Sequence, residues 1–436
     1  MKKIAIIGGG ISGISNAIHL IKCGYEVTIF EKSGSLGGIW TNGIANKKSH
    51  LQTPSFLYYF SWKVKWKNRY PFTDEIKNQI LKLSSELEKA TIYYNCEVIA
   101  LSFCENECVK IETSSGHSMK FIGCIVATGL HQKENQFKLH NINSKIKFIS
   151  FSEIDTVQSY MDKQIIILGM GASAIEAFNT VSAYNAKKIS FVSTSPRWVF
   201  PNNFLYFIIS FFPFTKPDQI IEKFVYNQLK KTYIKNNLEC ILPILSPAKT
   251  KPGSISNSFF RLCNKLRPSF YTYDSIKKIN NNDVILNSGI IIPDVDIVIA
   301  CTGWQTLNFD FLKDSNLRKD LDLCIEKGYL YLHEFVPGYN NIVFSNYKSG
   351  FGSTGFAPYI SSILLQNYLE QKEIFPSKSE QNDWLNKEEL KWEKAPNVFQ
   401  FINMYESIKS SSKFFSNSQR GRWFINKIFI KNKRSN

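Results

Sequence analysis

The sequence contains the pattern of strand, glycine-rich turn and helix twice, once from residue 3 and again from residue 164. In each copy a short, wholly apolar run leads directly into closely spaced glycines. Strands that are apolar on both faces are typical of parallel sheets covered by helices on both sides. In such sheets nucleotides bind where the strand ends and the helix begins. We therefore predict an α/β protein with two dinucleotide-binding, Rossmann-like domains.

The first glycine turn has the sequence GGGISG at residues 8–13. In this GxGxxG pattern Gly8 permits the tight turn, Gly10 lets the backbone approach a pyrophosphate, and Gly13 lets the helix pack closely on the strand. The helix N-terminus then favours the phosphate charge. The next strand ends at Glu31, and an acid at that place accepts hydrogen bonds from ribose hydroxyls. The predicted contacts are Gly8, Gly10, Ser12, Gly13 and Glu31.

The second glycine turn, GMGASA at residues 169–174, follows the apolar run IIIL. Alanine in the third position of the pattern still allows close helix packing. The strand after this helix ends in STSPR at residues 193–197, which offers hydroxyls and an arginine but no acid. Such a set accommodates a ribose 2′-phosphate, so we predict NADPH rather than NADH. The predicted contacts are Gly169, Gly171, Ala172, Ser173, Ala174 and Arg197.

Two further apolar strands end in small-residue turns, ATG at residues 127–129 and TGW at residues 302–304. Their positions, one between the glycine turns and one after the second, suggest that the second domain is inserted into the first. The expected divisions are the first part of the first domain at 1–150, the second domain with an apolar insertion at 160–290, the completion of the first domain at 291–376, and a helical basic tail at 377–436.

Beyond the glycine turns, the chain resembles the flavin-containing monooxygenase family. Members of that family follow the ribose acid with a basic residue and then GG-x-W, and here Glu31 is followed by Lys32 and by GGIW at residues 37–40. Together the matching segments cover most of residues 1–370 in the family's order. They also include LQTP at 51–54, YYFS at 58–61, YPF at 70–72, and the ATG and TGW turns.

The resemblance implies FAD in the first domain and NADPH in the second, with a small-molecule substrate and dioxygen as reactants. It adds a set of cofactor contacts, among which Trp40 is also expected to be a core aromatic: Lys32, Gly38, Trp40, Gln52, Thr128, Gly129, Thr302 and Gly303. In the implied reaction a C4a-hydroperoxyflavin oxygenates a soft nucleophile, an amine nitrogen or sulfur. The flavin supplies this chemistry, so no metal site is expected.

Gln52 is the predicted catalytic residue. It stands where many family members carry an asparagine beside the flavin, and its amide could hydrogen-bond flavin or peroxide, although a packing role is equally consistent. One family signature, FxGxxxH, is missing, because Phe151 stands at the histidine position and the glycine is absent. Its loss weakens the Baeyer–Villiger branch most and leaves the N- or S-oxygenating branch open.

Three alternatives compete with the monooxygenase. One is an NADPH oxidase, or another FAD-dependent NADPH oxidoreductase that inserts no oxygen, and a second is a flavoprotein that is not an enzyme. The third, a disulfide reductase, needs a cysteine pair beside the flavin. Cys104 and Cys108 form the only close pair, and their spacing and their position between the two nucleotide motifs do not suit a redox-active disulfide. We expect these two to be a chance surface pair and the cysteines in general to be mostly buried free thiols.

The formal charge of +17 is spread along the chain without a nucleic-acid-binding motif, so we expect no nucleic-acid partner. The N-terminus leads directly into a strand, which leaves no room for a signal peptide and predicts a cytoplasmic protein. The apolar run at 204–214 is too short to span a bilayer. Together with the basic, aromatic-containing tail at 420–434, it suggests peripheral contact with the inner face of a membrane.

Overall fold

The computed structural model describes most of the chain between residues 2 and 392. The described residues are 2–52, 55, 58, 61, 64–104, 108–130, 133–137, 144–201, 219–245, 254–305, 308–327, 330–345, 347, 357–370 and 375–392. The expectations for residues 204–214 and 420–434 lie outside this part of the chain.

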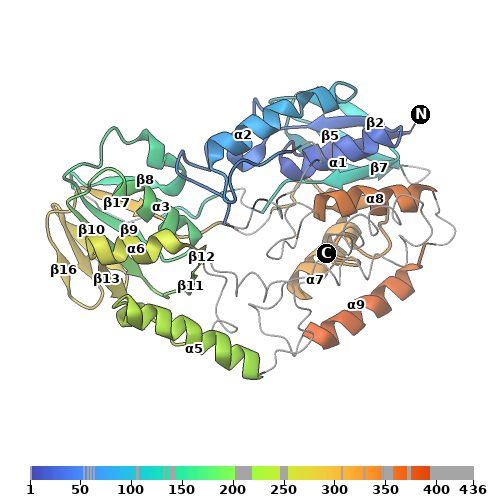
Figure 1. The fold of residues 1–436 in the computed structure, drawn as a ribbon. Helices are drawn as coiled ribbons and strands as arrows, with labels where there is room; N and C mark the ends of the chain where they lie inside the picture. The colour runs from blue at the N-terminus through green and yellow to red at the C-terminus, as the bar shows by residue number, and fades with distance from the viewer. Residues whose placement is uncertain are drawn as a thin grey trace, which may run out of the picture.

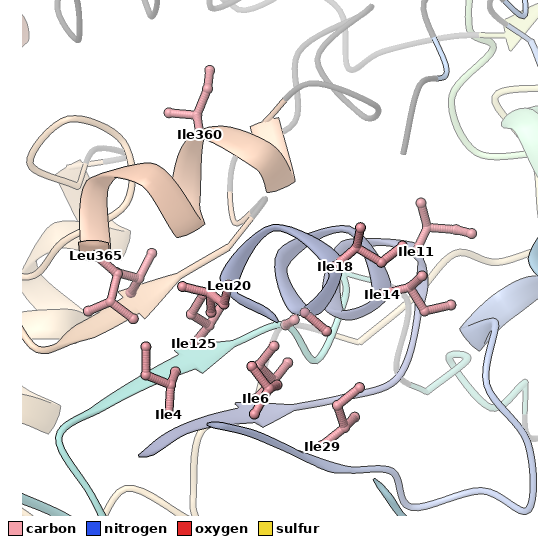
Figure 2. Packing of buried hydrophobic residues seen from close by; sticks show 14 of the residues in the cluster. Ile4, Ile6, Ile11, Ile14, Ile18, Leu20, Ile29, Ile125, Ile360 and Leu365 are labelled. Atoms are coloured by element: carbon pink, nitrogen blue, oxygen red, sulfur yellow. The ribbon is translucent and has the colours of Figure 1, made fainter. Parts of the chain in front are cut away.

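The first domain is built on a five-stranded sheet with the order β18-β7-β1-β2-β3, in which every pair is parallel. Alternate residues of β1 point to opposite faces, and both faces are buried. Ile4 and Ile6 pack with helices α1 and α8, whereas Ala5 and Ile7 pack with the small antiparallel sheet β4-β5-β6 and with α7. Figure 2 shows the first of these layers. The elements are β1 (Lys3–Ile7), α1 (Ile11–Lys22), β2 (Glu26–Phe30), α2 (Thr73–Lys82), β3 (Thr91–Tyr93), β4 (Val98–Cys104), β5 (Cys108–Thr113), β6 (Ser118–Phe121), β7 (Gly123–Val126), α7 (Ser315–Lys327), β18 (Ile342–Phe344) and α8 (Ala357–Glu370).

The second domain repeats this plan on the sheet β13-β10-β9-β17-β8, again wholly parallel. Ile165 and Ile167 of β9 pack towards α3, α5 and α6, and Ile166 and Leu168 pack towards the antiparallel strands β14 and β15. Figure 1 shows the two domains side by side. The elements are β8 (Lys147–Ser150), β9 (Gln164–Leu168), α3 (Ala172–Ser182), β10 (Lys188–Ser193), β11 (Val199–Phe200), α5 (Gln219–Lys235), β12 (Ser254–Ile255), α6 (Asn257–Leu266), β13 (Ser269–Thr272), β14 (Ile276–Asn280), β15 (Asp283–Leu286), β16 (Ile291–Ile292) and β17 (Ile297–Ala300).

The predicted insertion is confirmed, because the chain leaves the first sheet after β7, forms the second sheet, and returns to the first sheet only at β18. The expected boundaries are shifted by strand pairing. Strand β17 lies beside β9 in the second sheet, although residues 291–376 were expected to complete the first domain, and β8 also belongs to the second sheet. An apolar strand such as β17 satisfies either parallel sheet equally well, so its sequence does not reveal which one it joins.

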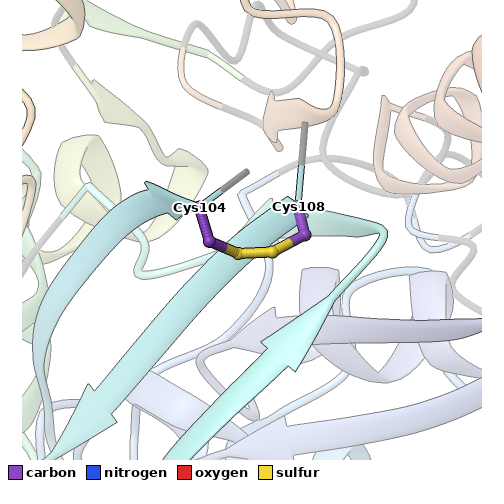
Figure 3. Close-up of a disulfide and its surroundings, with 2 residues drawn as sticks. All are labelled: Cys104 and Cys108. Atoms are coloured by element: carbon purple, nitrogen blue, oxygen red, sulfur yellow. A yellow bond between two sulfur atoms is a disulfide. The ribbon is translucent and has the colours of Figure 1, made fainter. Parts of the chain in front are cut away.

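The structure contradicts the expectation for one cysteine pair. Cys104 and Cys108 stand opposite each other at the end of the β4–β5 hairpin, with Cα atoms 5.2 Å apart, and form a disulfide (Figure 3). The hairpin register brings them together, since the spacing of four residues places both at the closing end of the ladder. The other seven cysteines are free thiols, and five of them are buried.

Part of the expected tail belongs to the folded core. Helix α9 (Lys378–Trp392) inserts Gln381 and Leu385 into the first domain, and the Gln381 side chain accepts a hydrogen bond from the Gly338 amide. Within the described residues, no helix has both the length and the apolar character needed to cross a bilayer.

Candidate cofactor-binding sites

In the first glycine turn, close packing requires glycine at two of the three glycines of the GxGxxG pattern. Gly8 has a φ of 104°, and a Cβ there would lie 2.5 Å from the carbonyl oxygen of Ala127. A Cβ on Gly13 would lie 1.9 Å from the Gly8 carbonyl oxygen, so any side chain would push α1 away from β1. These two positions are glycine because the protein's backbone requires it.

Gly10 differs, because the protein itself leaves room beside it. Its φ is −71°, and the nearest atom to an added Cβ, the Cα of Gly38, would be 3.7 Å away. It precedes the first turn of α1, which contains no acidic residue, and no side chain caps that end of the helix. The backbone N–H groups and the helix dipole are therefore presented to an approaching anion.

Glu31 lies against this turn, as the sequence predicts for the ribose-binding acid. It is buried, and its Oε2 accepts a hydrogen bond from the Gly9 amide at 2.6 Å. Its Oε1 accepts from the amide and the hydroxyl of Ser33 at 2.8 and 2.7 Å. These contacts orient the carboxylate at the end of β2, while the neighbouring Lys32 is exposed.

The GG-x-W segment also lies on the glycine turn, since the Gly37 amide donates to the Gly9 carbonyl at 2.8 Å. Gly38 approaches Gly10 closely enough that a Cβ on Gly38 would lie 3.1 Å from the Gly10 Cα. Trp40 points into the core, where its indole N–H donates to the Tyr58 hydroxyl at 2.7 Å. This contact anchors the segment in the core.

The second glycine turn has the same construction. Gly169 has a φ of 109°, and a Cβ there would lie 2.4 Å from the carbonyl oxygen of Cys301, the residue after β17. Gly171 precedes α3, and its Cβ position is open except for Nη1 of Arg197, which lies 3.7 Å away. Burial lowers the pKa of Arg197 below the usual arginine value, but the guanidinium remains cationic at neutral pH. A permanent cation thus stands beside the turn.

The two small-residue turns occupy equivalent places, directly after the strands that flank the glycine turns. Gly129 and Gly303 both have positive φ, at 76° and 93°. Thr302 is held by Asn135, since its hydroxyl donates to the Asn135 carbonyl at 3.1 Å and its own carbonyl accepts from the Asn135 amide group at 3.1 Å. Thr128 is partly exposed beside Gly129.

Gln52 lies where the two domains meet. Its Nε2 donates to Oε1 of Glu176 on α3 at 3.5 Å, and its Oε1 accepts from the Ile255 amide at 3.3 Å. Glu176 also accepts from the Ser49 hydroxyl at 2.6 Å. The sequence analysis did not identify Glu176, because a single carboxylate on a helix of small apolar residues gives no indication of a partner 124 residues away.

Burial raises the pKa of Glu176, against the opposing effect of hydrogen bonds from Ser49 and Gln52. The folded state therefore binds its proton more tightly than the unfolded state does. The stability that this carboxyl contributes is full below its unfolded pKa and is lost as the pH rises through the folded value. We therefore expect Glu176→Gln to become more stable relative to the wild type as the pH rises from 5 to 8, because the glutamine does not ionise.

Urea unfolding at both pH values tests this expectation. Glu153→Gln is the matched control, because hydrogen bonds from Ser150 lower the pKa of Glu153. That carboxyl is ionised in both states above pH 5, so its replacement should change stability equally at pH 5 and pH 8. A pH-independent effect of Glu176→Gln would contradict the assignment.

Comparison with known proteins agrees with this arrangement. The family described as pyridine nucleotide-disulphide oxidoreductase matches residues 2–206. Flavin-containing monooxygenase 1 of Mus musculus is 24% identical over 385 residues, which cover 77% of this chain and 67% of the relative. A 4-hydroxybenzoate brominase (decarboxylating) of Marinomonas mediterranea is 22% identical over 340 residues, covering 72% and 64%. The chain spans about two thirds of the length of these curated relatives.

Solved structures share the fold. An open structure of cyclohexanone monooxygenase has a TM-score of 0.77 at 12% identity, covering 95% of this chain and 98% of that one. A structure of OTEMO in complex with FAD and NADP has a TM-score of 0.75 at 15% identity, with coverages of 91% and 90%. At these identities the likeness establishes the two-domain architecture alone.

Proposed function

We propose that this chain, which is similar to flavin-containing monooxygenases over most of its length, is an FAD- and NADPH-dependent monooxygenase. Its substrate is a small molecule that offers an amine nitrogen or a sulfur for oxygenation. One observation carries the proposal: two dinucleotide cradles occur in one chain, the first formed by residues 8–13 at the start of α1 and the second by residues 169–174 at the start of α3. In each, a glycine with free space at its Cβ position, Gly10 or Gly171, precedes a helix N-terminus that no side chain caps. Bound NADPH supplies a hydride, and bound FAD supplies the activation of dioxygen.

The first cradle fits FAD. The pyrophosphate would accept hydrogen bonds from the N-terminal amides of α1 at Gly10, and the ribose would meet the buried Glu31 carboxylate. Oδ1 of Asn16, one helical turn beyond Ser12, is buried without a hydrogen-bond partner among the described residues. An unsatisfied buried polar atom so close to the turn is consistent with a ligand or water at this place.

The second cradle fits NADPH. The amides at the start of α3 would bind the pyrophosphate, and Arg197 beside Gly171 adds a cation that supports a further phosphate. Gln52 remains the proposed catalytic residue. Its contacts with Glu176 and Ile255 join the two domains, and this support favours a role where the two nucleotides meet.

The experiment supplies purified protein with NADPH, isotopically labelled dioxygen and a probe thioether, methyl p-tolyl sulfide. We expect one FAD per chain, and one labelled sulfoxide for each NADPH that is consumed. Peroxide without sulfoxide would indicate the oxidase alternative, since the reduced flavin would then release its oxygen unused. NADPH that is bound but not consumed would favour the non-enzymatic flavoprotein.

A peripheral contact with an anionic membrane stays a proposal that rests on sequence. It depends on the apolar run at 204–214 and on the alternation of basic and aromatic residues at 420–434. A small-molecule substrate and dioxygen are the proposed reactants.

A further inference from the structure

A cavity of about 540 Å³ lies between the first domain and the second. The first domain contributes lining residues from the segments 48–52 and 69–72, and the second contributes the C-terminal end of α3 and the start of α6. The glycine turn of the second domain lies at the opposite, N-terminal end of α3. Eleven helical residues extend about 16 Å, so the cavity lies away from the glycine turn. Gln52, the proposed catalytic residue, is also part of its lining.

The charged side chains that line the cavity are all positive. Lys48, Arg69 and Arg261 line it, and its described lining contains no aspartate or glutamate. Within the described part of the chain, none of these three cations forms an ion pair with a carboxylate. Three like charges around one hollow repel each other, and an anion bound among them would relieve that repulsion.

The start of α6 adds to this preference. The helix has ten residues, and Ser256 caps it by accepting a hydrogen bond from the Phe259 amide. Its first turn contains no acidic residue. Residues 256–258 line the cavity, so the positive end of the helix dipole faces the same space as the cations.

The rest of the lining contains both apolar and polar side chains. Leu51, Ile255 and Leu262 lie around the cavity, and the rings of His50 and Phe72 pack with their centroids 5.6 Å apart. A bare inorganic ion would leave these groups without a partner. A ligand with a charged head and an apolar body would use both kinds of surface.

We propose that this cavity binds a small organic carboxylate, with its charged group among Lys48, Arg69 and Arg261 and its apolar body against the Leu51 and Phe72 side. The planar guanidinium groups suit a carboxylate, which they can bind through two parallel hydrogen bonds. Since the cations come from both domains, the ligand joins them. The test of this inference is ligand binding, which does not require the proposed oxygenation to take place.

Isothermal titration of the FAD-containing protein with benzoate tests the site. Benzamide is the neutral ligand of matched shape, and inorganic phosphate is the anion without an apolar body. We expect benzoate to bind at least about tenfold more tightly than either, because only benzoate satisfies both the cations and the apolar wall. Equal affinity for benzoate and benzamide, or for benzoate and phosphate, would overturn the proposal.

Substitutions in the lining test whether benzoate binds in this cavity. Arg261→Ala and Arg69→Ala should each weaken benzoate binding about tenfold, with Arg261→Lys intermediate. Lys277→Ala, an exposed cation on β14, is the control and should bind as the wild type does. FAD content and NADPH consumption without benzoate should stay unchanged, which verifies folding. Unchanged benzoate affinity in both arginine-to-alanine variants would overturn the proposal, because benzoate would then be bound elsewhere.

Discussion

Replacing Gly10 by valine is expected to remove FAD from the protein while the fold stays intact. An added Cβ at Gly10 meets its nearest neighbour, the Cα of Gly38, at an ordinary contact distance of 3.7 Å. The same atoms would occupy the space through which a pyrophosphate reaches the amides of α1. We expect at least about a hundredfold loss of FAD affinity, which removes roughly 2.7 kcal/mol or more of binding free energy. Flavin absorbance of the purified protein and the melting temperature of its flavin-free form are the measurements.

Two further glycine variants separate loss of the ligand from loss of the fold. Gly13→Ala should lower the melting temperature of the flavin-free protein, because its Cβ would lie 1.9 Å from the Gly8 carbonyl oxygen. Gly24→Ala adds a side chain in open space at a φ of 86°, so it should cost only about 1 kcal/mol of backbone strain and keep FAD. A Gly10→Val protein that retains its full flavin content would contradict the first cradle as the FAD site.

The local parts of the architecture could be predicted from the sequence. Each nucleotide cradle is encoded within about 30 consecutive residues, as strand, turn, helix and strand. The pattern therefore identified Gly8, Gly13 and Gly169 before any packing was known, and the structure places all three against neighbouring backbone carbonyls. Glu31 was predictable for the same reason, since the second strand positions it beside the turn.

Contacts between distant segments could not be predicted. The apolar run of β17 fits either parallel sheet, and only its pairing with β9 decides the matter. Cys104 and Cys108 looked like a surface pair until the register of the hairpin placed them opposite each other. The contact of Gln52 with Glu176 joins residues of two domains, and the mixed cavity lining likewise depends on how those domains pack.

Replacing Arg197 by alanine is expected to raise the KM for NADPH by tenfold to a hundredfold and to leave the KM for NADH nearly unchanged. The strand that precedes Arg197 ends in hydroxyl residues without an acid, and the guanidinium lies 3.7 Å from the Cβ position of Gly171. A charge-assisted contact with the 2′-phosphate contributes about 1.5 to 3 kcal/mol. Steady-state kinetics with both nucleotides measures the difference.

The position of Arg197 also defines the result that would contradict this assignment. Because the guanidinium lies beside the glycine turn, it could contact the pyrophosphate, which NADPH and NADH share. In that case Arg197→Ala would raise the KM for NADPH and the KM for NADH equally, and another residue would have to recognise the 2′-phosphate. Arg197→Lys separates charge from geometry, since lysine keeps the cation but lacks the planar fork. If the KM of Arg197→Lys for NADPH lies between those of the wild type and Arg197→Ala, and its KM for NADH is unchanged, bidentate recognition of the 2′-phosphate is the source of the preference.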